Sequence, residues 1–278
     1  MRTKVKLVDI NPSVVAAWRE IFSDNPEVEV VEGSMLEQKV DAWVSPTNAA
    51  GNMDGGLDGV IKSHLGQGVQ TALHKAIARQ GGRLSIGDAV CVESPEKPPR
   101  FLISTPTMEG SSDDVSKFAN VAWACAAAFQ AIHMRNNEVP GSIGSVAVPG
   151  LGAATGKVPP ERCASLMYAA YNLFRARSFQ TFDDMREAMN AIMPAPNLIS
   201  GRFALGEAMK DAGLGDAVLD DDEDEEQDGH SAVQATEAAE TAAEESESPE
   251  KASGSPNPDL SAFDQYQKKY QNWKEGQQ

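Results

Sequence analysis

Short apolar runs rich in β-branched residues alternate with longer segments of helical periodicity over the first two thirds of the chain. The short runs predict strands, and the longer segments predict helices because their apolar positions recur every three or four residues. The predicted strands cover 5–8, 28–31, 42–44, 88–92, 101–104 and 145–148, and the predicted helices cover 12–22, 58–79, 115–134 and 160–177. This alternation indicates an α/β fold in which a sheet lies between helices.

Local signals support these helices. Asn11 can cap the first one, and Pro12 suits its first position because the N–H that proline lacks would have no partner there. The segment 58–79 is interrupted near Gly66 and Gly68. The segment 115–134 carries an apolar stripe, which indicates one buried face; the stripe consists of Phe118, Val121, Cys125, Phe129 and Ile132.

The character of the chain changes after the predicted α/β domain, which we place at residues 1–180. Residues 181–215 are predicted to be a helical or irregular extension, with helical pattern over 182–193 that Pro194 and Pro196 would end. The pattern leaves open whether this extension completes the fold or covers a site.

Two further segments make up the C-terminal part. Residues 216–258 are rich in Asp, Glu, Ala and Ser and lack the apolar residues that offset the entropy cost of ordering, so they predict a disordered acidic tail that links to the end of the chain. Residues 259–278 predict a short amphipathic helix that could bind a protein partner; its apolar positions are Leu260, Phe263, Tyr266, Tyr270 and Trp273.

The net charge of −17 belongs almost entirely to the tail. From Asp211 to Gln278 there are 19 acidic and 4 basic residues, which gives −15 and leaves −2 for residues 1–210. A nearly neutral folded part lacks the clustered Lys and Arg of a general nucleic-acid surface, so direct nucleic-acid binding is not expected. The acidic run could instead mimic nucleic acid towards a basic partner.

Cysteine and histidine spacing predicts neither a disulfide framework nor a metal site. Cys91, Cys125 and Cys163 lie far apart, which fits a reducing compartment. The four histidines fall on separate segments and do not form a ligand set: they are His64, His74, His133 and His230. No apolar signal segment and no membrane-length apolar stretch is present, so we expect a cytoplasmic protein without a cofactor and without membrane contact.

The first candidate binding site is a glycine-rich segment that runs from Ser45 to Gly59, between a predicted strand and a predicted helix. Its glycines let the backbone approach a ligand, and the free N–H groups and dipole of a helix start favour a phosphate. Asn48 can donate to and accept from sugar hydroxyls, and Asp58 can act as a base or orient a water. The segment therefore predicts an anion and ribose site.

A second glycine-rich segment, 149–157, follows the strand predicted at 145–148. Two such loops at strand ends suggest a ligand with two phosphates, such as a nucleotide diphosphate. Lys157 follows Gly156 as in a P-loop, but Val158 stands where that motif needs Ser or Thr.

The two loops, Asn48 and the α/β order over about residues 3–178 together resemble the macrodomain family. Within it, the chain is most similar to a bacterial and phage branch that processes ADP-ribose-1″-phosphate. The resemblance implies a three-layer α/β/α fold with a mixed central sheet of six strands. It also implies that ADP-ribose or a derivative binds in a cleft above the strand ends.

The resemblance further implies roles for individual residues. Asn48 matches the asparagine that contacts the distal ribose, and Asp58 matches the aspartate that activates or positions a water near C1″ in hydrolytic members. The residues that would line the ligand are Ser34, Met35, Gly55, Gly56, Leu57, Gly59, Pro149, Gly150, Leu151, Gly152, Ala153, Thr155 and Gly156.

Two departures from the family pattern concern ligand affinity. Ser34 stands where most members carry an aspartate that accepts from the adenine amino group, and a neutral hydrogen bond is about half as strong as a charge-assisted one. Ala153 and Ala154 stand where many members place an aromatic residue against the distal ribose. A more open site would suit a bulkier or phosphorylated ligand.

The residues themselves leave alternatives open. Asp58 could serve only the helix dipole, and Asn48 could cap its own loop. Asp54 fits turn or cap chemistry better than catalysis, and it is the second candidate acid of the site. The leading hypothesis is a hydrolase of ADP-ribose-1″-phosphate or of ADP-ribosylated macromolecules. The alternatives are a non-catalytic ADP-ribose reader and an interaction protein that acts through its acidic tail.

Overall fold

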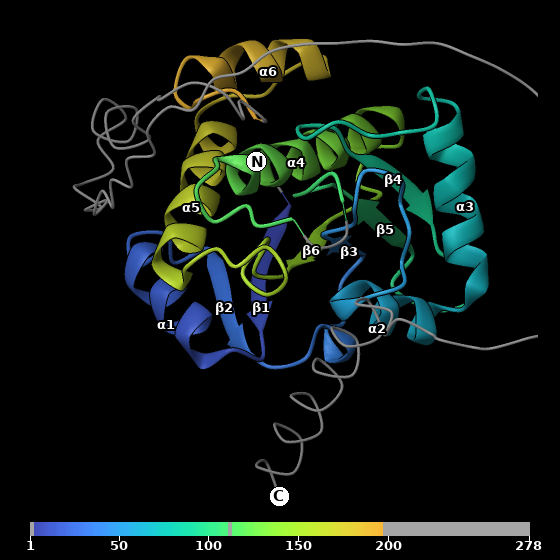
Figure 1. The fold of residues 1–278 in the computed structure, drawn as a ribbon, viewed down its shortest axis with the longest axis horizontal. Helices are drawn as coiled ribbons and strands as arrows, with labels where there is room; N and C mark the ends of the chain where they lie inside the picture. The colour runs from blue at the N-terminus through green and yellow to red at the C-terminus, as the bar shows by residue number, and fades with distance from the viewer. Residues whose placement is uncertain (1–2, 111–112, 197–278) are drawn as a thin grey trace, which may run out of the picture.

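The computed structural model describes residues 3–110 and 113–196. The predicted acidic tail at 216–258 and the predicted terminal helix at 259–278 lie outside the described residues. The described part is an α/β structure with one sheet at its centre (Figure 1).

The central sheet has six strands in the order β2-β1-β6-β3-β5-β4. All neighbouring pairs are parallel except β4 with β5, which is antiparallel. The mixed six-stranded sheet expected from the resemblance is therefore confirmed. The strands are β1 (Lys4–Asp9), β2 (Val28–Glu32), β3 (Ala42–Ser45), β4 (Val90–Glu93), β5 (Phe101–Ser104) and β6 (Ser145–Val148).

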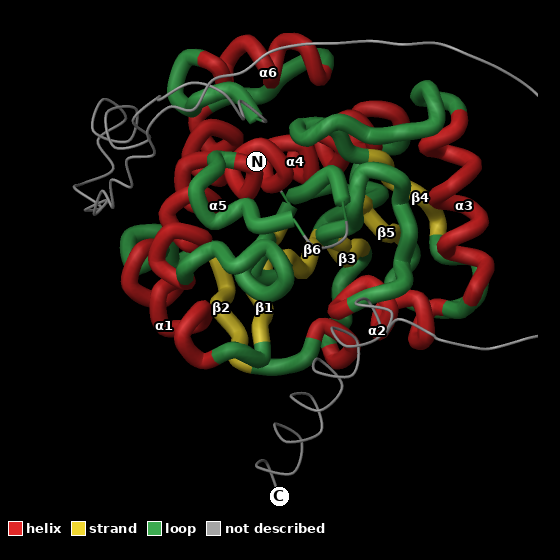
Figure 2. The backbone as a smooth tube through the Cα atoms, in the orientation of Figure 1, coloured by secondary structure: helices red, strands yellow, loops and turns green. Residues whose placement is uncertain are grey.

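Helices cover both faces of this sheet (Figure 2). One face packs against α1 (Pro12–Ile21), α4 (Asn120–Glu138) and α5 (Pro160–Ala176), and the other against α2 (Gly56–Leu65) and α3 (Gln67–Ala78). Successive strand residues point to opposite faces. In β3, for example, Val44 joins the core under α4 and α5, whereas Trp43 joins the core under α2 and α3. The two cores confirm the three-layer arrangement.

The bounds of two helices follow from particular contacts. The Asn11 side chain accepts a hydrogen bond from the Ser13 N–H, and Pro12 opens α1, as predicted. The prediction that α4 begins at Val115 is wrong, because α4 begins at Asn120. The N–H of Val115 donates to the carbonyl of Gly156 (3.1 Å), so this residue is tied to a distant loop instead of joining the helix.

The described part of the 181–215 extension forms α6 (Phe182–Asn190), which packs on α4 (Figure 1). Thr181 and Asp184 form a capping box at its start. Met189 is fully buried, and the Trp123 indole N–H donates to the carbonyl of Pro194 (2.8 Å) just after the helix. These contacts make α6 part of the core over α4.

The thiols of Cys91, Cys125 and Cys163 are free. Burial raises the pKa of the Cys91 thiol to about 12 and also raises the pKa values of the other two. The three therefore hold little thiolate at neutral pH. Among the helices of the described residues, none combines the length and the apolar character needed to cross a membrane.

Substitution of Met189 tests whether α6 belongs to the core. Met189→Ala removes a fully buried side chain, so we expect it to lower the free energy of unfolding by roughly 2–4 kcal/mol. Glu187→Ala changes an exposed residue of the same helix and should leave stability within about 0.5 kcal/mol. Urea denaturation of both variants measures the difference, and equal stability would contradict the packing.

Candidate functional site

The carboxyl ends of the parallel strands β1, β2, β3, β5 and β6 meet at one edge of the sheet. The segments that follow them are 10–11, 33–35, 46–55, 105–119 and 149–159. All the predicted site residues lie in these segments or in the first turns of α2. Because β3 and β6 are neighbours, the two glycine loops start side by side although about a hundred residues separate them.

The first glycine loop ends at the start of α2. Gly55 is the N-cap of this helix and makes no side-chain cap, and Gly56 has a φ of +50°, which favours glycine. The first-turn N–H groups of an α-helix have no partner within the helix. Gly55, Gly56 and Leu57 are half-buried and Gly59 is buried, so the loop has a solvent-facing side just ahead of the helix.

The two loops face each other across the strand ends. A Cβ atom on Gly56 would lie 3.8 Å from Thr155 Oγ1, which is ordinary van der Waals contact. A ligand that bridges the loops would therefore touch both backbones.

Asp58 lies in the first turn of α2 and is only 7% exposed. The hydroxyl of Ser45, at the end of β3, donates to Asp58 Oδ1. Burial raises the pKa of this carboxyl to about 7; the Ser45 hydrogen bond and the Lys62 charge lower it in part, and the Asp54 charge adds to the rise. Both protonation states are thus populated near neutral pH, as proton transfer to or from a reacting group requires.

Lys62 and Asp54 form an ion pair beside this carboxyl, with 2.5 Å between Lys62 Nζ and Asp54 Oδ1. The Lys62 side chain is 16% exposed, whereas that of Asp54 is 55% exposed. The lysine therefore reaches back along α2 to the preceding loop, which supports the interpretation of Asp54 as a loop residue.

Asn48 supports its own loop. Its side-chain oxygen accepts hydrogen bonds from the N–H groups of Ala50 (3.1 Å) and Asn52 (3.2 Å), and its backbone bridges to Met108. The loop-capping interpretation is thus present in the structure. A ribose contact by Asn48 stays a prediction.

The second loop is held by contacts with the rest of the fold and by contacts within itself. The N–H of Gly150 donates to Asp9 Oδ2 (3.1 Å). A Cβ on Gly156 would lie 2.7 Å from Val115 Cγ2 and 2.8 Å from the Gly152 carbonyl oxygen, so glycine is required there by packing alone. The buried members of the predicted set are Pro149, Leu151, Gly152 and Gly156, and the half-buried members are Gly150, Ala153 and Thr155. The half-buried residues are the ones that a ligand can reach.

Ser34 and Met35 follow β2. Ser34 is the N-cap of a 3-10 turn at Met35–Glu37, and Met35 is the first residue of that turn. The Ser34 hydroxyl oxygen accepts from the Leu36 N–H (3.1 Å), and Ser34 is 1% exposed. Met35 is also buried. The local cap therefore already uses the serine oxygen that was predicted to accept from adenine.

Sequence reasoning assigned no role to Ser45 or Lys62. The sequence does show that Ser45 is a polar residue at the end of an apolar strand, directly before the glycine loop, and this position could have marked it as a site residue. Its contact with Asp58 joins residues 13 positions apart and depends on how α2 packs against β3. A related buried pair, the Thr47 and Ser104 hydroxyls at 2.6 Å, lies beside it.

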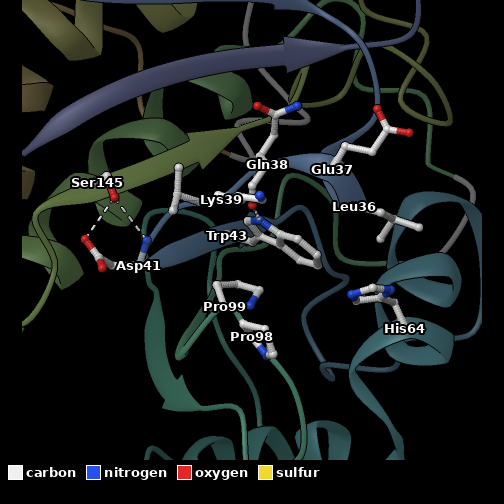
Figure 3. Close-up of a pocket in the computed structure, with 11 residues that line it drawn as sticks. Leu36, Glu37, Gln38, Lys39, Asp41, Trp43, His64, Pro98, Pro99 and Ser145 are labelled. Atoms are coloured by element: carbon white, nitrogen blue, oxygen red, sulfur yellow. Dashed lines mark hydrogen bonds between the residues drawn. The ribbon is translucent and has the colours of Figure 1, made fainter.

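A pocket of about 590 Å³ lies at the opposite, amino-terminal end of β3, β5 and β6 (Figure 3). Asp41 accepts there from the Ser145 hydroxyl (2.8 Å) and the Gly144 N–H (3.0 Å), and the Trp43 indole N–H donates to the Gln38 carbonyl (3.3 Å). These polar groups thus have partners within the fold, and no predicted site residue lines the pocket. Within residues 3–110 and 113–196, no group of three His, Cys, Asp or Glu side chains is placed to hold a metal ion.

Residues 44–167 match the family model of the Macro domain. This stretch begins in β3, ends in α5 and contains both glycine loops and Asp58. An uncharacterized protein of Aquifex aeolicus (strain VF5) is 29% identical over 155 residues, which cover 55% of this chain and 86% of that protein.

Three solved structures are also similar. The macrodomain of Mycobacterium tuberculosis DarG is 24% identical with a TM-score of 0.43, covering 52% of this chain and 90% of that one. The macrodomain of Thermus aquaticus DarG is 26% identical with a TM-score of 0.41, covering 50% and 87%. The Oceanobacillus iheyensis macrodomain with ADP is 16% identical with a TM-score of 0.43, covering 57% and 87%.

The raised pKa of Asp58 predicts a pH-dependent stability. The folded state holds this proton more tightly than the unfolded state. The carboxyl therefore lowers stability as the pH rises from 3.8, the ordinary pKa of an aspartate, to about 7, the pKa of Asp58 in the folded state. Asp58→Asn keeps an oxygen for the Ser45 hydroxyl but does not ionise. We expect it to exceed the wild type by roughly 2–4 kcal/mol in unfolding free energy at pH 8, and by little at pH 4.

Urea denaturation at the two pH values measures this difference. Asp24→Asn, which neutralises an exposed carboxyl, is the matched control and should show no comparable gain. An equal effect of Asp58→Asn at both pH values would show that the buried charge is not its cause.

Gly156 offers a separate test of the second loop. Gly156→Ala places a methyl group against Val115 and the Gly152 carbonyl, so we expect a loss of about 1–3 kcal/mol in stability. Gly144→Ala is the control, because its Cβ would meet Asp41 only at 3.4 Å. Thermal unfolding compares the two variants, and a stable Gly156→Ala protein would refute the tight packing.

Proposed function

We propose that the chain contains a macrodomain, that it binds ADP-ribose or a derivative between its two glycine loops, and that it hydrolyses the bond at C1″ of the distal ribose. The match of residues 44–167 to the Macro domain model supports this. Two substrate classes fit this proposal, namely ADP-ribose-1″-phosphate and ADP-ribose attached to a protein or nucleic acid. Both carry the ADP-ribose unit and differ in the substituent on C1″.

The observation that carries the catalytic part is the buried carboxyl of Asp58 at the start of α2. Burial brings its pKa to about 7, so a substantial fraction is ionised at neutral pH and remains basic enough to take a proton. A general base works best when its pKa lies near the operating pH. Helix-dipole stabilisation alone would not need a buried carboxyl held by a buried hydroxyl.

Binding would use the backbone of both loops. The uncapped start of α2 offers N–H groups and the positive end of the helix dipole to one phosphate, and the loop at 149–157 faces it from the neighbouring strand. Thr155 and Gly56 come close enough for one diphosphate to contact both loops. Asn48 would hold the distal ribose from the loop that it also caps.

The proposed reaction is a hydrolysis with water as the only co-reactant. The water oxygen forms a bond to C1″, or to the phosphorus or carbonyl carbon on the far side of the substituent oxygen, and the water proton passes to the Asp58 carboxylate. The bond between C1″ and its substituent oxygen, or the bond beyond that oxygen, breaks with its electron pair going to the leaving group. The proton then returns from Asp58 to the released product or to solvent.

The three free thiols support a reducing, cytoplasmic setting for this activity. We also propose that the amphipathic segment 259–278 binds a protein partner, as its spacing of aromatic residues suggests. That contact would act beside the ADP-ribose chemistry and does not replace it.

Phosphorus NMR of the full chain with ADP-ribose-1″-phosphate tests the proposal. We expect inorganic phosphate to appear at a rate proportional to the wild-type protein. Asp58→Ala should slow this by on the order of 10²–10⁴-fold, because it removes the base, while the diphosphate signals still shift on binding. Asp24→Asn should turn over like the wild type.

The other outcomes are equally informative. Unchanged turnover by Asp58→Ala would remove the assigned role of this carboxyl. Shifted diphosphate signals without product, repeated with an ADP-ribosylated peptide and an ADP-ribosylated oligonucleotide, would make the protein a reader. Signals that do not shift at all would contradict ADP-ribose as the ligand.

A further inference from the structure

We propose that Ser45 is the positioning residue of Asp58: its hydroxyl holds carboxylate oxygen Oδ1 and thereby presents Oδ2 to the attacking water. The inference rests on the proposed function, since Asp58 is the group that Ser45 serves. It assigns a role to a residue that would not touch the substrate.

Ser45 is built into the rigid part of the fold. It is the last residue of β3, is fully buried, and pairs with Ser104 of β5. Its carbonyl accepts from the Thr105 N–H (3.2 Å). A hydroxyl on a central strand is held more precisely than a group on a loop, so the oxygen it binds is equally well placed.

The bond from Ser45 to Asp58 spans the whole first glycine loop. It links the end of β3 to the first turn of α2, and the residues between them form the proposed ligand loop. Ser45 therefore places the carboxylate relative to the sheet, independently of the loop's own conformation.

The charged groups around Asp58 explain why a neutral donor matters. Lys62 stands one helical turn after Asp58 and is a natural partner for it, but Lys62 Nζ binds Asp54 Oδ1 at 2.5 Å. A direct pair with Lys62 would strongly favour the carboxylate and make it a poor base. The Ser45 hydroxyl orients the carboxylate and leaves it basic.

Three groups act on the ionisation of Asp58: Ser45 from β3, Lys62 from α2 and Asp54 from the loop. The Ser45 hydrogen bond lowers the pKa of the carboxyl, so its removal should raise that pKa further above about 7. A serine that only filled space would change stability and leave this titration where it is.

The test uses full-length protein labelled with carbon-13 at the aspartate carboxyl groups. Asp58→Asn identifies the Asp58 signal, and Ser45→Ala and Ser45→Cys remove or weaken the donor, the second at nearly constant size. Ser45→Thr keeps the hydroxyl. We expect the Asp58 signal to titrate roughly one pH unit higher in the Ala and Cys variants, and near the wild-type value in the Thr variant.

Turnover of ADP-ribose-1″-phosphate by the same proteins completes the test. The pH midpoint of kcat should rise with the carboxyl titration in the Ala and Cys variants. Their kcat at pH 7 should fall roughly tenfold with KM within about twofold of wild type, because fewer carboxylates are ionised and those are less well oriented.

An unshifted Asp58 titration in the folded Ala and Cys variants would overturn the role of Ser45. A shifted titration without wild-type turnover of ADP-ribose-1″-phosphate, an ADP-ribosylated peptide or an ADP-ribosylated oligonucleotide would support the Ser45 contact and contradict the proposed hydrolase. A shifted titration with an unmoved kcat midpoint would show that Asp58 is not the base. The two proposals can thus fail separately.

Discussion

The placement of β6 between β1 and β3 is the constraint on which the rest of the structure depends. This strand, the last one among the described residues, pairs in parallel with both neighbours, and parallel neighbours must be joined by crossover connections, which are usually helical. Parallel pairing gathers the carboxyl ends of five strands at one edge. Two glycine loops about a hundred residues apart then become neighbours, and a ligand can contact both.

The same edge holds a carboxyl that costs stability. Asp58 is buried beside a sheet of apolar strands, and its ionised form is disfavoured there. The carboxyl has a neutral hydroxyl, that of Ser45, as its hydrogen-bond donor, because the nearby Lys62 binds Asp54. This arrangement lowers the stability of the fold at neutral pH, but it suits proton transfer there. Buried ionisable groups that lower stability and have a strongly shifted pKa are typical of functional sites.

The two loops need glycine for two different physical reasons. At Gly56 the positive φ and the ordinary contact with Thr155 leave space at the edge, which is what a ligand needs. At Gly156 the neighbours are Val115 and the Gly152 carbonyl, so packing accounts for the residue without a ligand. The second loop therefore owes its shape mainly to the fold, and only its half-buried residues are accessible to a ligand.

Local features were determined by the sequence itself. The alternation of strands and helices, the Asn11 cap and the position of Asp58 at a helix start depend on residues a few positions apart, and short-range periodicity and capping reveal them. Long-range contacts were decided only by the tertiary structure. Val115 is held by Gly156, which delays the start of α4, and α6 packs on α4 through Met189. Ser45 meets Asp58 for the same reason: packing of α2 on β3 brings together groups that no local pattern relates.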